Sequence, residues 1–329
     1  VEEFKEAADF YRMEYSEDLM GMFRDFGCML LLKCKVDTEG KADLERLLEG
    51  RHKLKGTVKR QLMTVSEELA QLWEPGEQDG SGDTGEYEGS QNVWEMFQTA
   101  LEEIFHFCLY SKGGKNRYLL PEETAKPLLR LLTFPEGMMA GNEGLVVLDT
   151  QCGAGSALMA ASRYLKNLRL MGYEKDEEMW AAAVIMSQLS GLEMELHLED
   201  GARADLYESC DLVISNPVYG TDTIKDEELI DQLPGELKTV RGRYHMELIR
   251  SMQALNFDGK AMLIVPNSFL FANRTESMKV RKWLLQSYSL EAIISLPEDT
   301  FMYSGVRSGV MVFSKPFMSG GWEGHTQRV

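Results

Sequence analysis

The stretch Asp211-Leu-Val-Ile-Ser-Asn-Pro-Val-Tyr-Gly220 decides the fold. Its apolar part, Leu212–Ser215, predicts a short buried strand, and Pro217 ends that strand because proline has no N–H and a fixed φ. Asn216 is therefore expected at the carboxyl end of a strand, where open α/β sheets bind ligands. The Asn216 amide oxygen and the Pro217 carbonyl are two acceptors on a rigid turn, and Tyr219 adds a flat aromatic face. Together they suit a planar group bearing an NH2, such as adenine, although a strand-ending turn with a buried tyrosine also fits.

A glycine-containing loop follows an earlier predicted strand, Leu145–Leu148. It reads Asp149-Thr-Gln-Cys-Gly-Ala-Gly155 and leads directly into a predicted helix. Gly153 and Gly155 permit a tight turn and a close approach of a ligand to the backbone. The third glycine of the dinucleotide fingerprint and the Gly-Lys-Ser/Thr ending of a phosphate-binding loop are both missing. An acidic residue before such a turn favours a ligand with a cationic amino group and no pyrophosphate, such as S-adenosylmethionine; a chance glycine turn is the alternative.

Two more acidic residues follow predicted strands. Glu174 comes after the strand at Leu168–Gly172 and is placed to accept hydrogen bonds from ribose hydroxyls. Asp200 comes after the strand at Leu196–Leu198 and is placed to receive the adenine amino group of the same ligand. A surface carboxylate and a helix N-cap are the ordinary alternatives for these two positions. Because the carboxyl ends of parallel strands meet at one edge of a sheet, we expect both residues to lie on one rim with Asp149 and Asn216.

The second half of the chain alternates between predicted strands and helices. This spacing predicts a doubly wound, mostly parallel, Rossmann-like sheet. The last two predicted strands, Leu290–Ser295 and Val310–Phe313, have no helix between them and are expected to form an antiparallel hairpin at the sheet edge. The expected domains are an N-terminal helical region at 1–92, with an acidic Gly/Ser linker near 74–91, and an α/β domain at 93–329.

Composition limits the function. Thirty-five basic residues against 53 acidic ones give a net charge of −18, which disfavours a protein that must hold a phosphate backbone unaided. The five cysteines are scattered and form no C-x-x-C pair, so we expect neither a metal site nor disulfides, and a cytoplasmic location. No apolar run near the start is long enough to span a membrane. The first residue is Val1 rather than Met, which indicates a fragment or a processed chain.

These motifs resemble the N6-adenine DNA methyltransferases, above all the modification subunits of type I restriction-modification systems. Asp149–Gly155 is similar to that family's Asp-Pro-x-Cys-Gly-Thr-Gly loop, and Ser215–Gly220 to its Asn-Pro-Pro-Phe/Tyr-Gly motif. Tyr118-Leu-Leu-Pro121 stands where the family has an aromatic-Tyr/Phe-Thr-Pro segment. The resemblance continues, in order, through Gly259–Phe271, Val280–Leu285, Ile293–Pro297, Phe301 and Gly305-Val306.

The resemblance implies that the domain at 93–329 is an S-adenosylmethionine-dependent methyltransferase domain with a methyltransferase sheet. It also implies methyl transfer from S-adenosylmethionine to the N6 amino group of an adenine flipped out of double-stranded DNA. It assigns catalysis to Asn216, Pro217 and Tyr219, with Tyr219 and Phe301 stacking on the base. The cofactor-binding residues that it implies are Asp149, Cys152, Gly153, Gly155, Glu174, Asp200 and Tyr118. Three residues depart from the family pattern: Val218 and Thr150 each replace a proline, and Leu120 replaces a threonine.

Partners and alternatives complete the expectations. Few residues follow Pro316, so a separate specificity subunit is expected to supply DNA recognition, and a second copy of the chain is a further possible partner. The departures at Val218 and Leu120 keep open a weak or inactive methylase-fold module that binds DNA or a partner. Enzymes that methylate glutamine side chains or RNA amino groups share the Asn-Pro-x-Tyr motif and are the other alternative.

Overall fold

The computed structural model describes much of the chain. The described residues are 1–15, 19–36, 46–47, 54, 56–73, 88–110, 119–132, 134, 144–207, 209–220, 222–298, 300–301 and 306–316, with the backbone alone for residues 14 and 88–95. Most of the predicted acidic linker, residues 74–87, lies outside them. None of the helices in this part of the chain is both long and apolar enough to cross a membrane.

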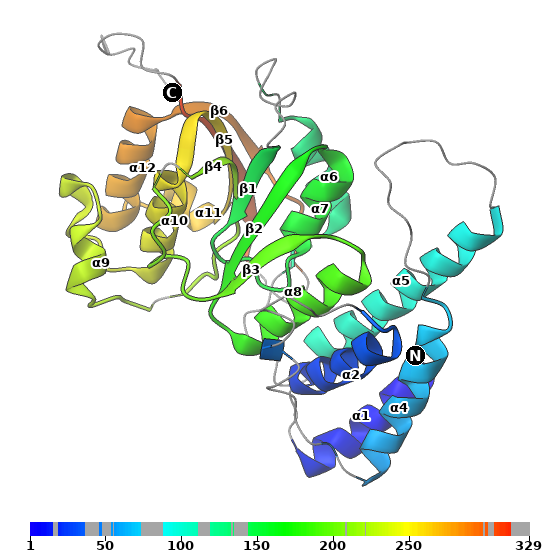
Figure 1. The fold of residues 1–329 in the computed structure, drawn as a ribbon. Coiled ribbons are helices and arrows are strands. Elements are labelled where there is room, and N and C mark those ends of the chain that lie inside the picture. The colour runs from blue at the N-terminus through cyan, green and yellow to red at the C-terminus, as the bar shows by residue number, and fades with distance from the viewer. Residues whose placement is uncertain are drawn as a thin grey trace. The chain divides into compact units, whose positions relative to one another are not determined.

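A seven-stranded sheet has the order β3-β2-β1-β4-β5-β7-β6 (Figure 1). Its strands are β1 Leu145–Asp149, β2 Leu168–Glu174, β3 Met194–Leu198, β4 Cys210–Ser215, β5 Leu255–Pro266, β6 Ser289–Ser295 and β7 Ser308–Ser314. Strands β1, β4 and β5 pair in parallel, whereas β7 pairs antiparallel with both β5 and β6. The predicted fold class, with its antiparallel edge hairpin, is therefore confirmed.

The strand order reverses direction between β1 and β4. In a doubly wound sheet this reversal is the topological switch point, outside which ligands bind at the carboxyl ends of the strands. The pairing of Val147 with Leu212 and of Leu148 with Val213 fixes the register of the two strands. Both strands are buried along most of their length, which explains their nearly continuous apolar sequences.

Helices precede and alternate with the strands. They are α1 Glu2–Glu14, α2 Met20–Lys33, α4 Gly56–Ala70, α5 Glu88–Leu109, α6 Glu122–Arg130, α7 Ser156–Tyr164, α8 Glu177–Leu189, α9 Glu227–Asp231, α10 Arg243–Gln253, α11 Asn267–Phe271 and α12 Thr275–Ser287, with a 3-10 turn at Gly235–Leu237. Helix α5 begins at Glu88, within the stretch near 74–91 that is predicted as a linker, and the linker stays a prediction. Helices α9 and α11 have five residues each, too few for a periodic pattern to reveal them.

The chain forms two compact units. The first unit comprises Val1–Leu119, Cys152–Met159 and Gly172–Leu198, and the second comprises Leu120–Gln151, Ala160–Met171 and Glu199–Val329. The predicted boundary at residue 92 stays a prediction.

Within the first unit, the N-terminal helices pack on α8. Helix α2 contacts α8 at Gly27, where an added Cβ would lie 2.8 Å from the Ile185 Cγ1 atom, so only glycine permits this close approach. The Gln98 side chain on α5 donates a hydrogen bond to the Leu189 carbonyl at the end of α8, at 3.0 Å. Aromatic pairs fill the core between the helices, among them Phe23 with Phe105 at 5.1 Å between ring centroids.

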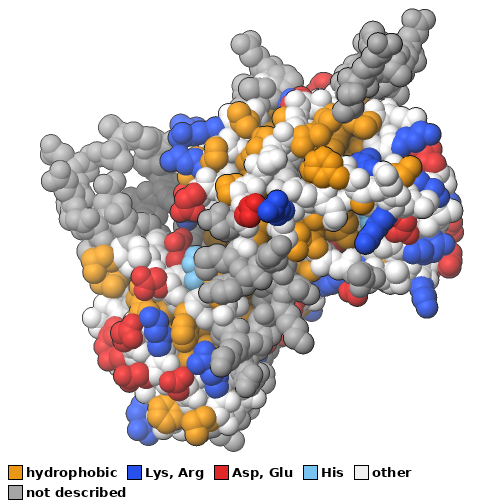
Figure 2. All heavy atoms as spheres, turned by 180° about the vertical axis from the view of Figure 1, so that it is seen from behind, with side chains coloured by type: hydrophobic (Ala, Val, Ile, Leu, Met, Phe, Trp, Pro, Cys, Tyr) orange, Lys and Arg blue, Asp and Glu red, His pale blue; other side chains and the backbone are white. Residues whose placement is uncertain are grey.

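Within the second unit, helix α10 lies beside β4 and β5 and also contacts α12 (Figure 1). Strand β5 is longer than the predicted Ala261–Val265, because its pairing with β4 shifts register between Cys210 and Leu212. Asp258 has a φ of +61° in the extra stretch. Exposed hydrophobic side chains of this unit include Phe271 at 77% and Ile293 at 52%. In the view of Figure 2, hydrophobic side chains gather over this unit, with Lys and Arg side chains around them.

Candidate active site

The predicted catalytic motif begins where β4 ends. Ser215 is the last residue of the strand and is fully buried, Asn216 is half-buried and Pro217 is buried. Val218, which replaces a family proline, is exposed by 46%. The predicted end of a buried strand just before Asn216 is confirmed, and Val218 projects outward without filling a core position.

Tyr219 is held at its hydroxyl and at its ring. Its hydroxyl donates to the Ser308 Oγ atom at 3.3 Å, and its ring meets the edge of the Tyr244 ring at 5.7 Å between centroids. Tyr244 in turn packs edge-on against Phe269 at 5.9 Å. Tyr219 stays half-buried, so part of it is open to a ligand. Phe301, the second predicted stacking residue, is only 6% exposed, and its role stays a prediction.

The glycine loop folds as a tight turn in the first unit. The Cys152 N–H donates to the Tyr173 carbonyl at 2.9 Å, and the Gly155 N–H donates to the Cys152 carbonyl at 2.8 Å. Gly153 and Gly155 have φ values of +56° and +79°, a conformation that disfavours any residue with a Cβ. The glycines are therefore required by the turn itself, as the sequence predicts.

Glu174 is oriented by the same turn. Its Oε2 atom accepts from the Gly153 N–H at 3.0 Å, and its Oε1 atom accepts from the Asp176 N–H at 2.7 Å. Burial raises the pKa of the Glu174 carboxyl above its ordinary value; the two backbone hydrogen bonds oppose this shift and the Asp176 carboxylate adds to it. The structure thus brings together Cys152, Gly153, Gly155 and Glu174 within the first unit.

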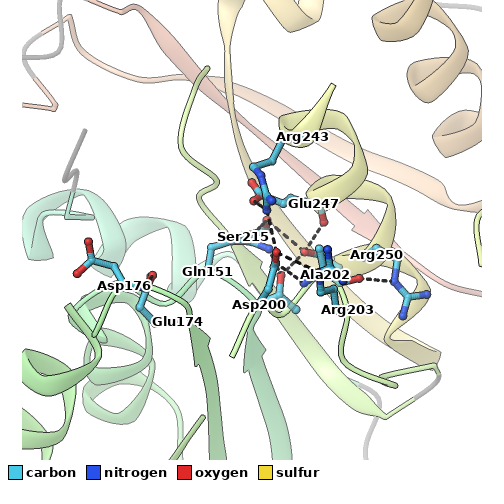
Figure 3. A network of polar contacts seen from close by, with 12 residues as sticks. Gln151, Glu174, Asp176, Asp200, Ala202, Arg203, Ser215, Arg243, Glu247 and Arg250 are labelled. Carbon is cyan, nitrogen blue, oxygen red and sulfur yellow. Dashed lines mark hydrogen bonds and ion pairs between the residues drawn. The ribbon is translucent and has the colours of Figure 1, made fainter. Parts of the chain in front are cut away.

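Asp149 and the predicted catalytic residues after β4 belong to the second unit. Asp149 is only 2% exposed, and its carboxylate accepts from the Gln151 N–H at 3.0 Å. The Gln151 side chain reaches the end of β4, where its Oε1 atom accepts from the Ser215 hydroxyl at 3.4 Å (Figure 3). Since Gln151 Nε2 also donates to Thr150 Oγ1 at 2.7 Å, the residue after Asp149 and the residue before Asn216 are linked through the Gln151 side chain.

Asp200 lies in a polar network after β3. Its Oδ2 atom accepts from Arg243 at 2.9 Å, and its Oδ1 atom accepts from the Ala202 N–H at 3.2 Å (Figure 3). Arg250 clamps the same loop by donating to the Ala202 carbonyl at 2.9 Å and to the Ala204 carbonyl at 2.8 Å. The loop is thus fixed by α10, and a cofactor amino group would share Asp200 with Arg243.

Sequence reasoning missed the supporting residues. Gln151, Arg243, Arg250 and Ser251 each contact a predicted site loop, but the last three lie on α10, where nothing in the local sequence distinguishes them from ordinary helix residues. The predicted cofactor residue Tyr118 lies outside the described residues. Whether all predicted residues share a single cleft stays a prediction.

The donor set suits S-adenosylmethionine. A buried carboxylate at Asp149, a positive-φ glycine turn and a Glu174 carboxylate fixed by two backbone amides are groups that a cationic amino acid and a ribose require. The fold and these groups define the class as an S-adenosylmethionine-dependent methyltransferase.

Comparison with known proteins identifies the family. The N-6 DNA methylase family model matches residues 97–320, and the chain belongs to this family. The expected cofactor, S-adenosylmethionine, is confirmed, and the similarity to methylase and modification subunits of type I restriction enzymes confirms the predicted resemblance.

Two curated relatives are 24% and 27% identical to this chain over the aligned residues. The type I restriction enzyme MjaVII methylase subunit of Methanocaldococcus jannaschii is 24% identical over 298 residues, covering 83% of this chain and 47% of the relative. The type II restriction enzyme and methyltransferase RM.BcgI of Heyndrickxia coagulans is 27% identical over 191 residues, covering 52% of this chain and 28% of that protein. The chain therefore spans half or less of the length of these relatives.

Solved structures share the fold. A class I S-adenosylmethionine-dependent methyltransferase from Listeria monocytogenes matches with a TM-score of 0.68 and 16% identity, covering 97% of this chain and 88% of the other. A modification subunit of a type I restriction enzyme from Vibrio vulnificus matches with a TM-score of 0.61 and 17% identity, covering 87% and 61%.

Proposed function

We propose that this chain transfers a methyl group from S-adenosylmethionine to the N6 amino group of adenine in DNA. The observation that carries the proposal is the turn after β4, beside the switch point of the sheet. There the half-buried Asn216 is followed by the buried Pro217 and by a Tyr219 ring that Ser308 and Tyr244 hold in place. Membership of the N-6 DNA methylase family supports the same reaction.

The chemistry follows from the acceptors on this turn. The lone pair of the adenine amino nitrogen is delocalised into the ring, so the nitrogen is a poor nucleophile. In the proposal, Asn216 Oδ1 and the Pro217 carbonyl accept the two N–H groups and favour a pyramidal nitrogen whose lone pair points at the donor methyl. S-adenosylmethionine supplies a methyl group on a positively charged sulfur. The N–CH3 bond forms as the S–CH3 bond breaks, and the nitrogen then loses one proton to solvent.

The base must leave the helix to reach this turn, because the amino group of a paired adenine is engaged with thymine. In the proposal, the flipped base stacks on Tyr219, an interaction that contributes about 1–3 kcal/mol for an aromatic side chain. The cofactor is held by Asp149, the Cys152–Gly155 turn, Glu174 and Asp200. The outward Val218 leaves the acceptors of the turn in place, so the family's missing proline does not remove them.

DNA recognition is assigned to a partner. The net charge of −18 opposes unaided binding to a phosphate backbone, so we propose a specificity subunit and a second copy of this chain in the working complex. The M. jannaschii relative is by name a methylase subunit of a type I restriction enzyme, which supports this arrangement. We also propose a cytoplasmic location, which the scattered cysteines without a C-x-x-C pair support.

The test is radiolabelled methyl transfer to unmethylated DNA, with and without the product of the neighbouring gene. Asn216→Ala is expected to abolish transfer while leaving S-adenosylmethionine binding within about 3-fold of wild type, because the residue acts on the base. Val218→Ala, an exposed neighbour on the same turn, is the matched control and retains transfer. Equal transfer by wild type and Asn216→Ala would refute the assigned role, and cofactor binding without any transfer would favour an inactive binding module.

A further inference from the structure

A cluster of buried hydroxyls lies between the loop after β1 and the end of β4. Thr150, Ser215 and Ser251 are each no more than 1% exposed. These three residues and Gln151, whose amide is hydrogen-bonded to Thr150, form the hydroxyl cluster. The Thr150 Oγ1 and Ser251 Oγ atoms lie 2.5 Å apart, and the Ser251 and Ser215 Oγ atoms lie 3.5 Å apart. The four residues come from three elements, because Ser251 is on α10.

The hydrogen bonds of the cluster form one directed chain. Gln151 Nε2 donates to Thr150 Oγ1 at 2.7 Å, and Ser251 Oγ donates to the Glu247 carbonyl at 2.8 Å. Since Ser251 has a single hydroxyl hydrogen, the short contact with Thr150 requires Thr150 to be the donor. The Ser215 hydroxyl donates to Gln151 Oε1 at 3.4 Å, which fixes the orientation of the Gln151 amide. The Ser251 hydroxyl also faces the Ser215 Oγ atom at 3.5 Å, but its single hydrogen goes to the Glu247 carbonyl, which is closer at 2.8 Å, so the chain ends on the backbone of α10.

The position of the cluster gives it a role beyond packing. Strands β1 and β4 pair at Val147 with Leu212 and at Leu148 with Val213, and Thr150 and Ser215 stand two residues further along each strand. The cluster therefore continues the connection between the strands beyond the pairing of Leu148 with Val213. Thr150 is adjacent to Asp149, on the proposed cofactor side, and Ser215 is adjacent to Asn216, on the proposed base side.

We propose that Thr150, Gln151 and Ser251 are positioning residues for methyl transfer, which fix the separation between Asp149 and Asn216. This inference rests on the proposed function of the chain. Methyl transfer requires the donor and the acceptor nitrogen in line, and a displacement of about 1 Å lowers a rate by about 100-fold. Buried hydrogen bonds hold such a separation more narrowly than apolar contacts, because each has a preferred length and direction. None of the three residues needs to touch the reacting atoms.

The test compares Thr150→Val with Thr150→Ser in the full chain together with its partner. Valine keeps the shape of threonine but has no hydroxyl, whereas serine keeps the hydroxyl. We expect Thr150→Val to lower the single-turnover rate at saturating S-adenosylmethionine by about 10-fold or more, with cofactor affinity within about 3-fold of wild type. Thr150→Ser is expected to restore the rate to within about 3-fold. The rate is corrected for the active fraction from the stoichiometry of cofactor binding, so that partial unfolding does not imitate a slower step.

A second pair of variants tests whether the rate falls because a positioning residue is lost or because any buried hydroxyl is lost. Ser187 on α8 is also fully buried and donates to a backbone carbonyl, that of Leu192, at 2.7 Å. Ser251→Ala and Ser187→Ala therefore remove similar hydrogen bonds. We expect the corrected rate to fall for Ser251→Ala and to be unchanged for Ser187→Ala, and an equal fall in both would overturn the inference.

The outcomes also separate this inference from the proposed function. If wild type transfers methyl groups, Asn216→Ala does not, and Thr150→Val transfers at the wild-type rate, this inference alone is wrong. It is also wrong if Thr150→Ser is as slow as Thr150→Val, because the loss then follows from shape and not from the hydroxyl. If wild type with its partner transfers no methyl group, the proposed function fails and this inference fails with it.

Discussion

Replacement of Arg250 by methionine tests how firmly α10 holds the loop that carries Asp200. Arg250 donates to the carbonyls of Ala202 and Ala204 at 2.9 and 2.8 Å, and these two residues are 0% and 7% exposed. Methionine fills a similar volume but leaves both carbonyls without these donors. An unsatisfied buried group costs about 1–3 kcal/mol.

Two effects reduce the loss of folding stability in Arg250→Met. Burial lowers the pKa of Arg250, so removal of its charge also removes a desolvation penalty, and the methionine chain retains apolar contacts. We therefore expect Arg250→Met to lower the free energy of unfolding by about 2–4 kcal/mol, measured by urea denaturation. We expect faster amide exchange at 202–205 and weaker S-adenosylmethionine binding by calorimetry, because the Asp200 loop is released.

Arg241→Met is the matched control. Arg241 also donates to two backbone carbonyls, those of Lys238 at 2.7 Å and Val240 at 2.9 Å, but its bond to Lys238 is exposed to solvent. Water replaces a lost donor there, so we expect a change of less than about 1 kcal/mol and unaltered cofactor affinity. Equal stability losses in the two variants, or unchanged exchange at 202–205 in Arg250→Met, would refute the role given to Arg250.

Three further predictions concern packing and pH. Gly172→Ala places a Cβ 2.8 Å from the Cys152 Sγ atom and is expected to lower the free energy of unfolding by about 1–3 kcal/mol. Gly235→Ala is the control: its added Cβ has no atom within 4 Å, so we expect a change of less than about 0.5 kcal/mol. Equal shifts of the melting temperature in the two variants would count against the Cys152 contact. Burial raises the pKa of Glu174, so its carboxylate becomes protonated as pH is lowered through that raised value, and S-adenosylmethionine affinity is expected to fall with it. If a Glu174→Gln variant shows the same pH profile of affinity as wild type, Glu174 is excluded as the cause. Burial lowers the pKa of His245 despite the nearby Glu276, so its contribution to stability is present above the unfolded histidine pKa of about 6.5 and is lost as pH falls through the lower folded value. His245→Gln should therefore weaken the fall of the unfolding free energy as pH drops below about 6.5, and an unchanged slope would contradict this.

The sequence predicts the strand ends of the site well, for a physical reason. Buried parallel strands are short apolar runs, and each stops at a residue that cannot continue it or that must reach solvent. Pro217 after β4 and the acid-led glycine turn after β1 are such stops, and Asn216 and Asp149 lie where they are expected. The turn glycines are equally visible, since Gly153 and Gly155 adopt positive φ values.

The supporting contacts could not be predicted, because they join residues far apart in the sequence. Arg250 clamps carbonyls at Ala202 and Ala204, and Ser251 meets Thr150, yet neither partner is marked by its local sequence. The extension of β5 depends on an irregular register near Asp258, where a positive φ in a residue other than glycine is not apparent from composition. These features follow from the packing of α10 and β5 on their neighbours.

The central claim is that Asn216 directs a methyl group to the amino nitrogen of adenine. The most direct measurement digests DNA to nucleosides after incubation with labelled S-adenosylmethionine, the chain and its partner, and identifies the labelled product by mass spectrometry. The account predicts N6-methyldeoxyadenosine with wild type and with Val218→Ala, and none with Asn216→Ala. Label in another nucleoside, or N6-methyldeoxyadenosine formed equally well by Asn216→Ala, would contradict it.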